Sequence, residues 1–317
     1  MRFRWIAATA AAAVVATGCG GGDEGAGVEQ RHYLSLGDSL TVGVQPDENG
    51  VPGETADGYT DVLYRRLYDA DSTLGHERMG CGGEDTTTFV EGGLPRCDQR
   101  YGGRSQLEAA EEFLVENRGD VALVTVTIGG NNFTGCVSDL ENPDGPAVDT
   151  ACVDDGLERI GTEVPEIANR LRAAAGPDTP IIAMTYYNPF LAALLLEDDE
   201  DAEASASPEE AGAGGEAGGD AAAPEDDLVG YAAGVLERMN ASLRDSYSGA
   251  DIEVADVEGV FASADFGVPA DSTTGMPTNV QRICDLTWMC DVDRGPDIHT
   301  NRAGAQEIAA AFEELVG

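Results

Sequence analysis

Lysine is missing from this sequence of 317 residues: all 18 basic residues are arginine, against 59 aspartates and glutamates, and the net charge is −41. A chain without a basic surface cannot displace counterions from phosphate, which excludes a nucleic-acid-binding protein. An excess of one charge destabilises the folded state by self-repulsion, and salt screens that repulsion. The acidic excess has two possible explanations: adaptation to high or fluctuating salt outside the cell, or GC-rich codon bias combined with one acidic insertion.

The amino terminus has the pattern of an export signal. Two arginines precede the apolar run Trp5–Val15, which is too short to span a membrane. A charged start, an apolar middle and small residues thereafter predict a signal peptide over residues 1–18. The sequence Ala-Thr-Gly-Cys at 16–19 resembles the lipobox of bacterial lipoproteins, which implies a lipidated Cys19 and anchoring to the outer face of the cell membrane; the alternative is an ordinary signal and a secreted protein. Residues 19–30, rich in glycine and acidic residues, are expected to form a flexible tether.

Six cysteines remain beyond Cys19, and an even number in an exported chain indicates disulfides. Six cysteines allow 15 pairings, and the sequence alone does not choose among them. We favour pairing between nearest neighbours, because each bond then closes one local loop. A metal site is the rival interpretation, but no CxxC pair is present. The favoured pairs are Cys81–Cys97, Cys136–Cys152 and Cys284–Cys290.

Strands alternate with helices along the chain, which predicts a parallel sheet covered on both faces. Val121–Gly130 is a continuous apolar run of the kind that is buried on both sides. Ser105 and Glu108 form a capping box that opens a helix to about Asn117. The other expected strands are His32–Gly37, Pro180–Asn188 and Asp251–Val257, and the other expected helices are Tyr59–Tyr68, Asp154–Ala175 with a kink or break at Pro165, Leu228–Tyr247 and Asn301–Val316.

Residues 197–227 interrupt the alternation. They hold 13 acidic residues, no basic residue and no aromatic residue. Such a segment cannot bury enough apolar surface to offset the entropy of ordering, so we expect a disordered insertion. A calcium-binding loop is an alternative, but the regular spacing of ligands is missing. The rest of residues 31–317 has the size of one α/β domain.

Ser39, in SLGDSLTVG, is the candidate nucleophile. It follows the first strand, so its hydroxyl is expected at the carboxyl edge of the sheet, where open α/β sheets bind ligands. A helix starting at Ser39 would direct N–H groups to the same place; alternatively, Asp38 and Ser39 are ordinary capping residues. Among the three histidines, His299 is the candidate base, because His32 opens a strand and His76 lies in a polar connection.

Two further segments supply candidate donors for a developing oxyanion. Gly80, in RMGCGGEDT, is expected to follow a further strand, the second along the chain, and the sequence Gly-Gly-Asn-Asn at 129–132 ends the strand that begins at Val121. Glycine permits close approach of the backbone, and the amide of Asn131 is a neutral donor. We expect the N–H groups of Ser39 and Gly80 and the amide of Asn131 to meet at one edge of the sheet.

These four blocks, GDSL, Gly80, GGNN and DIH, resemble those of the SGNH (GDSL) hydrolase superfamily. The resemblance covers residues 33–316 apart from the acidic insertion, and it is closest to the secreted actinobacterial esterases and lipases with three local disulfides. It implies a flavodoxin-like three-layer α/β/α sandwich with a central parallel sheet, and a serine ester hydrolase that needs no metal or organic cofactor. The roles implied are a nucleophile at Ser39, a base at His299 and an oxyanion hole completed by Gly80 and Asn131.

The sequence departs from the family pattern near the histidine. Pro296 stands three residues before His299, where the family usually has aspartate, and Asp297 stands two before it. Asp297 is one candidate to orient the imidazole, as the third member of a triad does. A backbone carbonyl from the segment Cys284–Cys290 is the other. Asn132 stands where aspartate is common, and we expect little effect on the chemistry.

The resemblance leaves the substrate open. A lipid or short-chain acyl ester is the favoured substrate. The alternatives are a carbohydrate esterase that removes acetyl groups and a surface lipoprotein that binds ligands without turnover. We expect a monomer that touches the membrane only through its lipid anchor, with disulfides that hold the loops of the catalytic edge in place.

Overall fold

The computed structural model describes residues 30–138, 147–188, 191, 228–294 and 296–316. The predicted signal peptide, Cys19, nearly all of the expected tether and the acidic insertion 197–227 lie outside the described residues. Within the described ranges, no helix has the length and apolar character needed to cross a membrane.

A five-stranded parallel sheet forms the centre of the molecule. Its strands are β1 (Arg31–Gly37), β4 (Leu74–Arg78), β5 (Val121–Thr127), β8 (Ile181–Met184) and β9 (Glu253–Ala255). They lie in the order β4-β1-β5-β8-β9, with every neighbouring pair parallel. This is the flavodoxin-like order 2-1-3-4-5, so the predicted sheet is confirmed. The apolar sequence of β5 follows from its central position, where both faces are covered.

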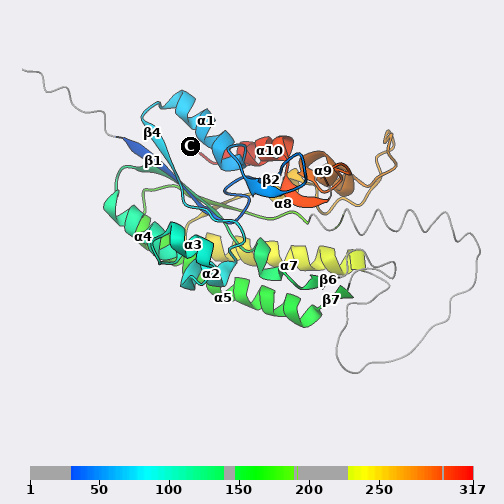
Figure 1. The fold of residues 1–317 in the computed structure, drawn as a ribbon, viewed down its shortest axis with the longest axis horizontal. Helices are drawn as coiled ribbons and strands as arrows, with labels where there is room; N and C mark the ends of the chain where they lie inside the picture. The colour runs from blue at the N-terminus through cyan, green and yellow to red at the C-terminus, as the bar shows by residue number, and fades with distance from the viewer. Residues whose placement is uncertain (1–29, 139–146, 189–190, 192–227, 295, 317) are drawn as a thin grey trace, which may run out of the picture.

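Helices cover both faces of the sheet and give the predicted three layers (Figure 1). One layer contains α1 (Tyr59–Ala70), α8 (Val257–Val260), α9 (Thr278–Leu286) and α10 (Arg302–Glu313). The opposite layer contains α2 (Thr86–Glu91), α3 (Pro95–Arg100), α4 (Gln106–Glu116), α5 (Thr150–Ala175) and α7 (Leu228–Ser248). Aromatic and aliphatic side chains between the layers form one continuous core.

Local signals in the sequence explain several helix boundaries. Ser105 accepts a hydrogen bond from the N–H of Glu108, and the Glu108 side chain accepts one from the N–H of Ser105, so the predicted capping box is confirmed. Asn301 caps α10 by accepting from two backbone N–H groups. A kink or a break was expected at Pro165, and the break is absent, because Pro165 lies inside one continuous helix of 26 residues, α5.

Three short antiparallel hairpins were not predicted. They are formed by β2 (Val44–Pro46) with β3 (Pro52–Glu54), β6 (Val137–Ser138) with β7 (Ala147–Val148), and β10 (Thr287–Trp288) with β11 (Asp297–Thr300). His76, expected in a polar connection, lies instead in β4, where its ring stacks on Tyr33 at 4.5 Å between centroids. The polar sequence of β4 fits an edge strand.

The strand order reverses between β1 and the central strand β5. Ligands of open α/β sheets bind beyond the carboxyl ends of the strands at such a switch point. Ser39 follows β1, and Asn131 lies in the 3-10 helix η1 (Gly130–Phe133), which follows β5. The fold therefore brings both predicted residues to the switch point.

Candidate active site

The turn that carries Ser39 is fixed to the neighbouring strand. Gly37, the last residue of β1, has a φ of +129°, and a Cβ there would clash with the carbonyl oxygen of Thr127 in β5. The N–H of Asp38 donates to that same carbonyl at 3.0 Å. Only glycine allows this close approach, which directs Asp38 and Ser39 past the end of β1. We call residues 37–43 the nucleophile turn.

No helix starts at Ser39, so that expectation was wrong. Residues 39–43 form turns, and the N–H of Val44 donates to the carbonyl of Ser39 at 2.9 Å as the chain enters β2. A helix dipole therefore does not act on Ser39. The short distance from β1 to β2 explains this, since the hairpin of β2 and β3 begins before a helix can form.

His299 lies on β11, with its imidazole oriented by Asp297. Asp297 Oδ1 accepts hydrogen bonds from the backbone N–H of His299 at 2.8 Å and from its Nδ1 at 2.7 Å. Burial alone would raise the pKa of Asp297, but the hydrogen bonds and charge of His299 outweigh it and lower that pKa. An ionised Asp297 holds the proton on Nδ1, which leaves Nε2 as the basic nitrogen.

The histidine strand and the nucleophile turn meet at one edge of the sheet. β11 lies against β2, which directly follows the nucleophile turn. Burial raises the pKa of Asp38, the neighbour of Ser39, to about 6, and the charge of His299 acts against that rise. Within the described residues, no hydrogen bond joins the Ser39 hydroxyl to the imidazole. Nucleophile–base contacts are often loose in the absence of substrate.

Gly80 does not present a free donor. Its N–H donates to the carbonyl of Ser35 at 3.1 Å, continuing the contact between β4 and β1. Gly82 lies beside the nucleophile instead: a Cβ built there would be 3.7 Å from Ser39 Cβ. In the described part of the chain, the N–H groups of Gly82 and Gly83 have no acceptor. The free donors were expected at Gly80, but in the structure they belong to the turn at Gly82–Gly83.

Asn131 and Asn132 have different surroundings. The side-chain amide of Asn131 donates one hydrogen bond to the carbonyl of Glu84 at 2.9 Å, which leaves its second N–H for another acceptor. Asn132 is buried, and its side chain exchanges two hydrogen bonds with Thr86, at 3.1 and 2.6 Å. Asn132 therefore joins η1 to α2, while Asn131 is the residue with a spare donor.

Glu84 is a buried carboxyl group that the sequence did not point to. It is 1% exposed, and it accepts a hydrogen bond from the side chain of Gln106. Gln106 in turn accepts from the N–H of Gly37 at 2.6 Å and donates to the carbonyl of Gly37 at 3.0 Å. Burial, with further contributions from nearby aspartates, raises the pKa of Glu84 to about 8. A protonated Glu84 thus lies between the Gly82–Gly83 turn and the nucleophile turn.

Three disulfides connect the loops of this edge, and the predicted pairing is confirmed. Cys81–Cys97 links the residue before Gly82 to α3, and Cys136–Cys152 links the chain after η1 to α5. Cys284–Cys290 links α9 to the loop that leads to β11. Each bond therefore restrains a segment next to a candidate site residue.

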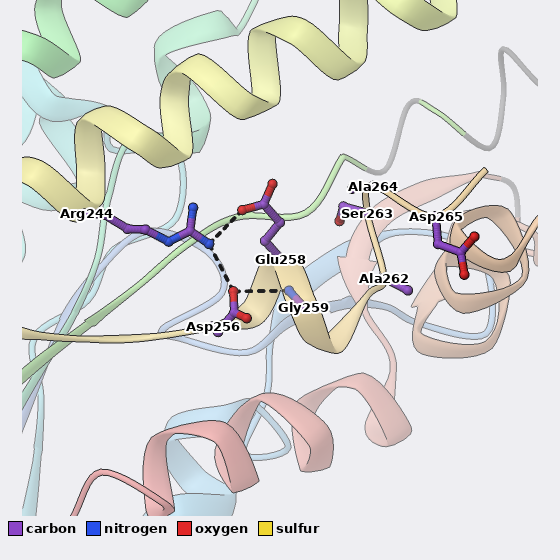
Figure 2. Close-up of a pocket in the computed structure, with 8 residues that line it drawn as sticks. All are labelled: Arg244, Asp256, Glu258, Gly259, Ala262, Ser263, Ala264 and Asp265. Atoms are coloured by element: carbon purple, nitrogen blue, oxygen red, sulfur yellow. Dashed lines mark hydrogen bonds and ion pairs between the residues drawn. The ribbon is translucent and has the colours of Figure 1, made fainter. Parts of the chain in front are cut away.

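A surface pocket lies at the carboxyl end of β9 (Figure 2). Arg244 points into it and pairs with Asp256 at 3.0 Å and Glu258 at 2.7 Å. Because both carboxylates pair with the guanidinium, the pocket offers no unpaired positive charge to a ligand, and Asp265 adds a further carboxylate to its lining. Neither Ser39 nor His299 lines it. Among the described residues, no group of histidine, cysteine or acidic side chains could hold a metal ion.

Comparison with known proteins identifies a family. The family model described as GDSL-like Lipase/Acylhydrolase matches residues 35–307. Similar solved structures include an extracellular lipase from Streptomyces rimosus, with 15% identity, coverage of 90% of this chain and 99% of that chain, and a TM-score of 0.47. A phospholipase A1 from Streptomyces albidoflavus matches with 14% identity, the same coverage and a TM-score of 0.47. At TM-scores below 0.5 neither likeness bears on activity, and no curated protein sequence matches the chain.

Proposed function

The chain belongs to the GDSL-like lipase/acylhydrolase family, and on this premise we propose that it hydrolyses acyl esters with Ser39 as the nucleophile. Membership of the family makes the chain a serine ester hydrolase. The assignment of Ser39 is carried by one observation: the Asp297–His299 pair lies on a strand that contacts the hairpin directly after the nucleophile turn. A base with an orienting carboxylate beside a serine is the arrangement that nucleophilic acyl transfer requires.

In the proposed reaction, His299 Nε2 removes the proton from the Ser39 hydroxyl as the oxygen attacks the acyl carbonyl. The imidazolium that forms is stabilised by Asp297, which stays ionised. The proton then passes to the leaving alcohol, and an acyl group remains on Ser39. Water, activated by the same imidazole, attacks this ester and releases the carboxylic acid.

The tetrahedral oxyanion needs donors that are in place before it forms. We assign this role to the N–H of Ser39, the N–H groups of the Gly82–Gly83 turn and the free amide N–H of Asn131. This replaces Gly80, whose N–H is bonded to Ser35. Gly80 still contributes indirectly, because a side chain there would clash with Thr41 in the nucleophile turn.

The experiment that tests this function measures hydrolysis of chromogenic esters of graded acyl length. Ser39→Ala should lower kcat/KM by on the order of 10⁴-fold or more, with an unchanged melting temperature as the control for folding. Activity of Ser39→Ala close to that of the wild type would overturn the assignment of the nucleophile. Preference for acetylated sugars over simple esters would favour a carbohydrate esterase, and no turnover in either protein would favour a ligand-binding lipoprotein.

We also propose that the protein acts outside the cell as a monomer. Support comes from the three disulfides, which persist in oxidising compartments, and from the signal-like start of the sequence. In this proposal Cys19 carries the lipid. Incorporation of a labelled fatty acid by the wild type and its loss in Cys19→Ser would test the anchor.

A further inference from the structure

Two consecutive buried tyrosines follow the central strand β8. Tyr186 and Tyr187 are each 6% exposed. Their backbone is fixed to α7, because the side chain of Asn240 accepts from the N–H of Tyr186 at 2.8 Å and donates to its carbonyl at 2.9 Å. Neighbouring residues in an extended chain point to opposite sides. The two hydroxyls therefore reach different parts of the active site from one rigid position.

Tyr186 contacts the nucleophile turn. Its hydroxyl donates to Asp38 Oδ2 at 2.6 Å, and the other oxygen of Asp38 accepts from the N–H of Leu40 at 3.0 Å. Asp38 thus holds the backbone on both sides of Ser39 while Tyr186 holds Asp38. The Tyr186 ring also packs against Gly130, where an added Cβ would lie 2.8 Å from the ring. The same phenol therefore joins the turn of the nucleophile to the segment of Asn131.

Tyr187 contacts the histidine strand. Its hydroxyl donates to the carbonyl of Ile298 at 2.8 Å, and Ile298 lies between Asp297 and His299. Its ring stacks on Phe261, with 4.0 Å between centroids and 8° between planes. The hydrogen bond fixes the backbone of β11 at the residue that separates the base from its orienting carboxylate.

We propose that Tyr186 and Tyr187 are positioning residues that set the distance between the Ser39 turn and the His299 strand. The inference rests on the proposed function, in which these two segments carry the nucleophile and the base. The two segments are 260 residues apart in the sequence. The tyrosine pair is a direct, rigid connection between them. Because reacting groups must be held at near-contact distances, a small displacement of either segment should lower turnover strongly.

The test uses Tyr186→Phe and Tyr187→Phe, which remove one hydroxyl each and keep the ring. Tyr247→Phe is a matched control, because Tyr247 is 1% exposed and its hydroxyl has no hydrogen-bond partner in the described part of the chain. Each of the first two variants should lower kcat for a chromogenic ester by about 10- to 100-fold, with KM changed less than about threefold. The control should stay within about twofold of the wild type in both constants.

Melting temperatures and titration of active sites separate a loss of reactivity from a loss of folded protein. The double variant should lose less than the product of the two single effects, because both hydroxyls act on the same Ser–His distance. Values of kcat for both single variants that match Tyr247→Phe would overturn the inference. Ser39→Ala in the same assay separates this outcome from a failure of the proposed function. If Ser39→Ala is inactive, the proposed function stands even when the tyrosine variants behave like the control. An active Ser39→Ala would refute the proposed function itself.

Discussion

The buried carboxyl of Glu84 makes a prediction about stability that can be worked through from the structure. Its pKa is raised from 4.5 to about 8, chiefly by burial. Between these two values the unfolded chain has lost the proton of Glu84 while the folded chain retains it. Stability must therefore fall as pH rises through this window, and the loss is complete above about pH 8. At about 1.4 kcal/mol for each unit, the free energy of unfolding should decrease by up to about 5 kcal/mol from this group.

The variant Glu84→Gln tests this reasoning, because an amide resembles the protonated acid and can still accept from Gln106. Denaturant unfolding at pH 5, 7 and 9 should give similar stabilities for the variant and the wild type at pH 5, and a more stable variant at pH 9. Glu163→Gln is the matched control, since Glu163 is a partly exposed carboxylate that accepts from Thr87 at 2.8 Å. Parallel stability curves for Glu84→Gln and the wild type would refute a protonated Glu84.

The same variant should change the pH dependence of activity. Ionisation of Glu84 would place a negative charge next to the turn that is proposed to bind an oxyanion, and would add to the charges of Asp38, Asp85 and Asp98 around it. Such a charge opposes the transition state. We expect the wild-type kcat to decline above about pH 8 and the decline to be weaker in Glu84→Gln. An unchanged alkaline limb in the variant would count against this effect.

Three further predictions concern the histidine, the disulfides and the charge. Asp297→Asn should lower kcat by up to about 10⁴-fold, because an amide no longer fixes the tautomer of His299; near-normal kcat would assign the orientation to another group. Mild reduction should lower turnover before the circular dichroism of the fold changes, since the Cys81–Cys97 bond restrains the Gly82–Gly83 turn; simultaneous loss of both would contradict this. The melting temperature should rise between low salt and molar NaCl, because salt screens a net charge of −41. A melting temperature that does not change with salt would show that charge repulsion does not limit the stability of the fold.

The sequence predicted those parts of the fold whose cause is local or periodic. The apolar run that forms β5 can only be buried, and the capping box at Ser105 starts α4 by itself. The disulfides were predictable because each joins close neighbours in the chain. The pair of Asp297 and His299 is likewise a contact within one strand.

The parts that the sequence did not predict depend on contacts between distant segments. Gly80 follows β4 as expected, but only the register of β4 on β1 shows that its N–H is used by Ser35. The burial of Glu84 could have been predicted only from its hydrogen-bond partner Gln106, which lies 22 residues further along the chain. In the sequence, Tyr186 looks like part of an ordinary strand end, because its hydrogen-bond partner Asp38 is 148 residues away along the chain. Such pairings require the folded arrangement.

The most direct test of the account is the site of covalent labelling by a fluorophosphonate ester, which reacts with activated serine nucleophiles. Peptide mass spectrometry of the labelled full chain should find one adduct, on Ser39, in the wild type. Labelling of folded His299→Ala should be far slower, because the base that activates Ser39 is missing. An adduct on a different serine, or equally fast labelling of Ser39 in His299→Ala, would contradict the pairing of Ser39 with His299.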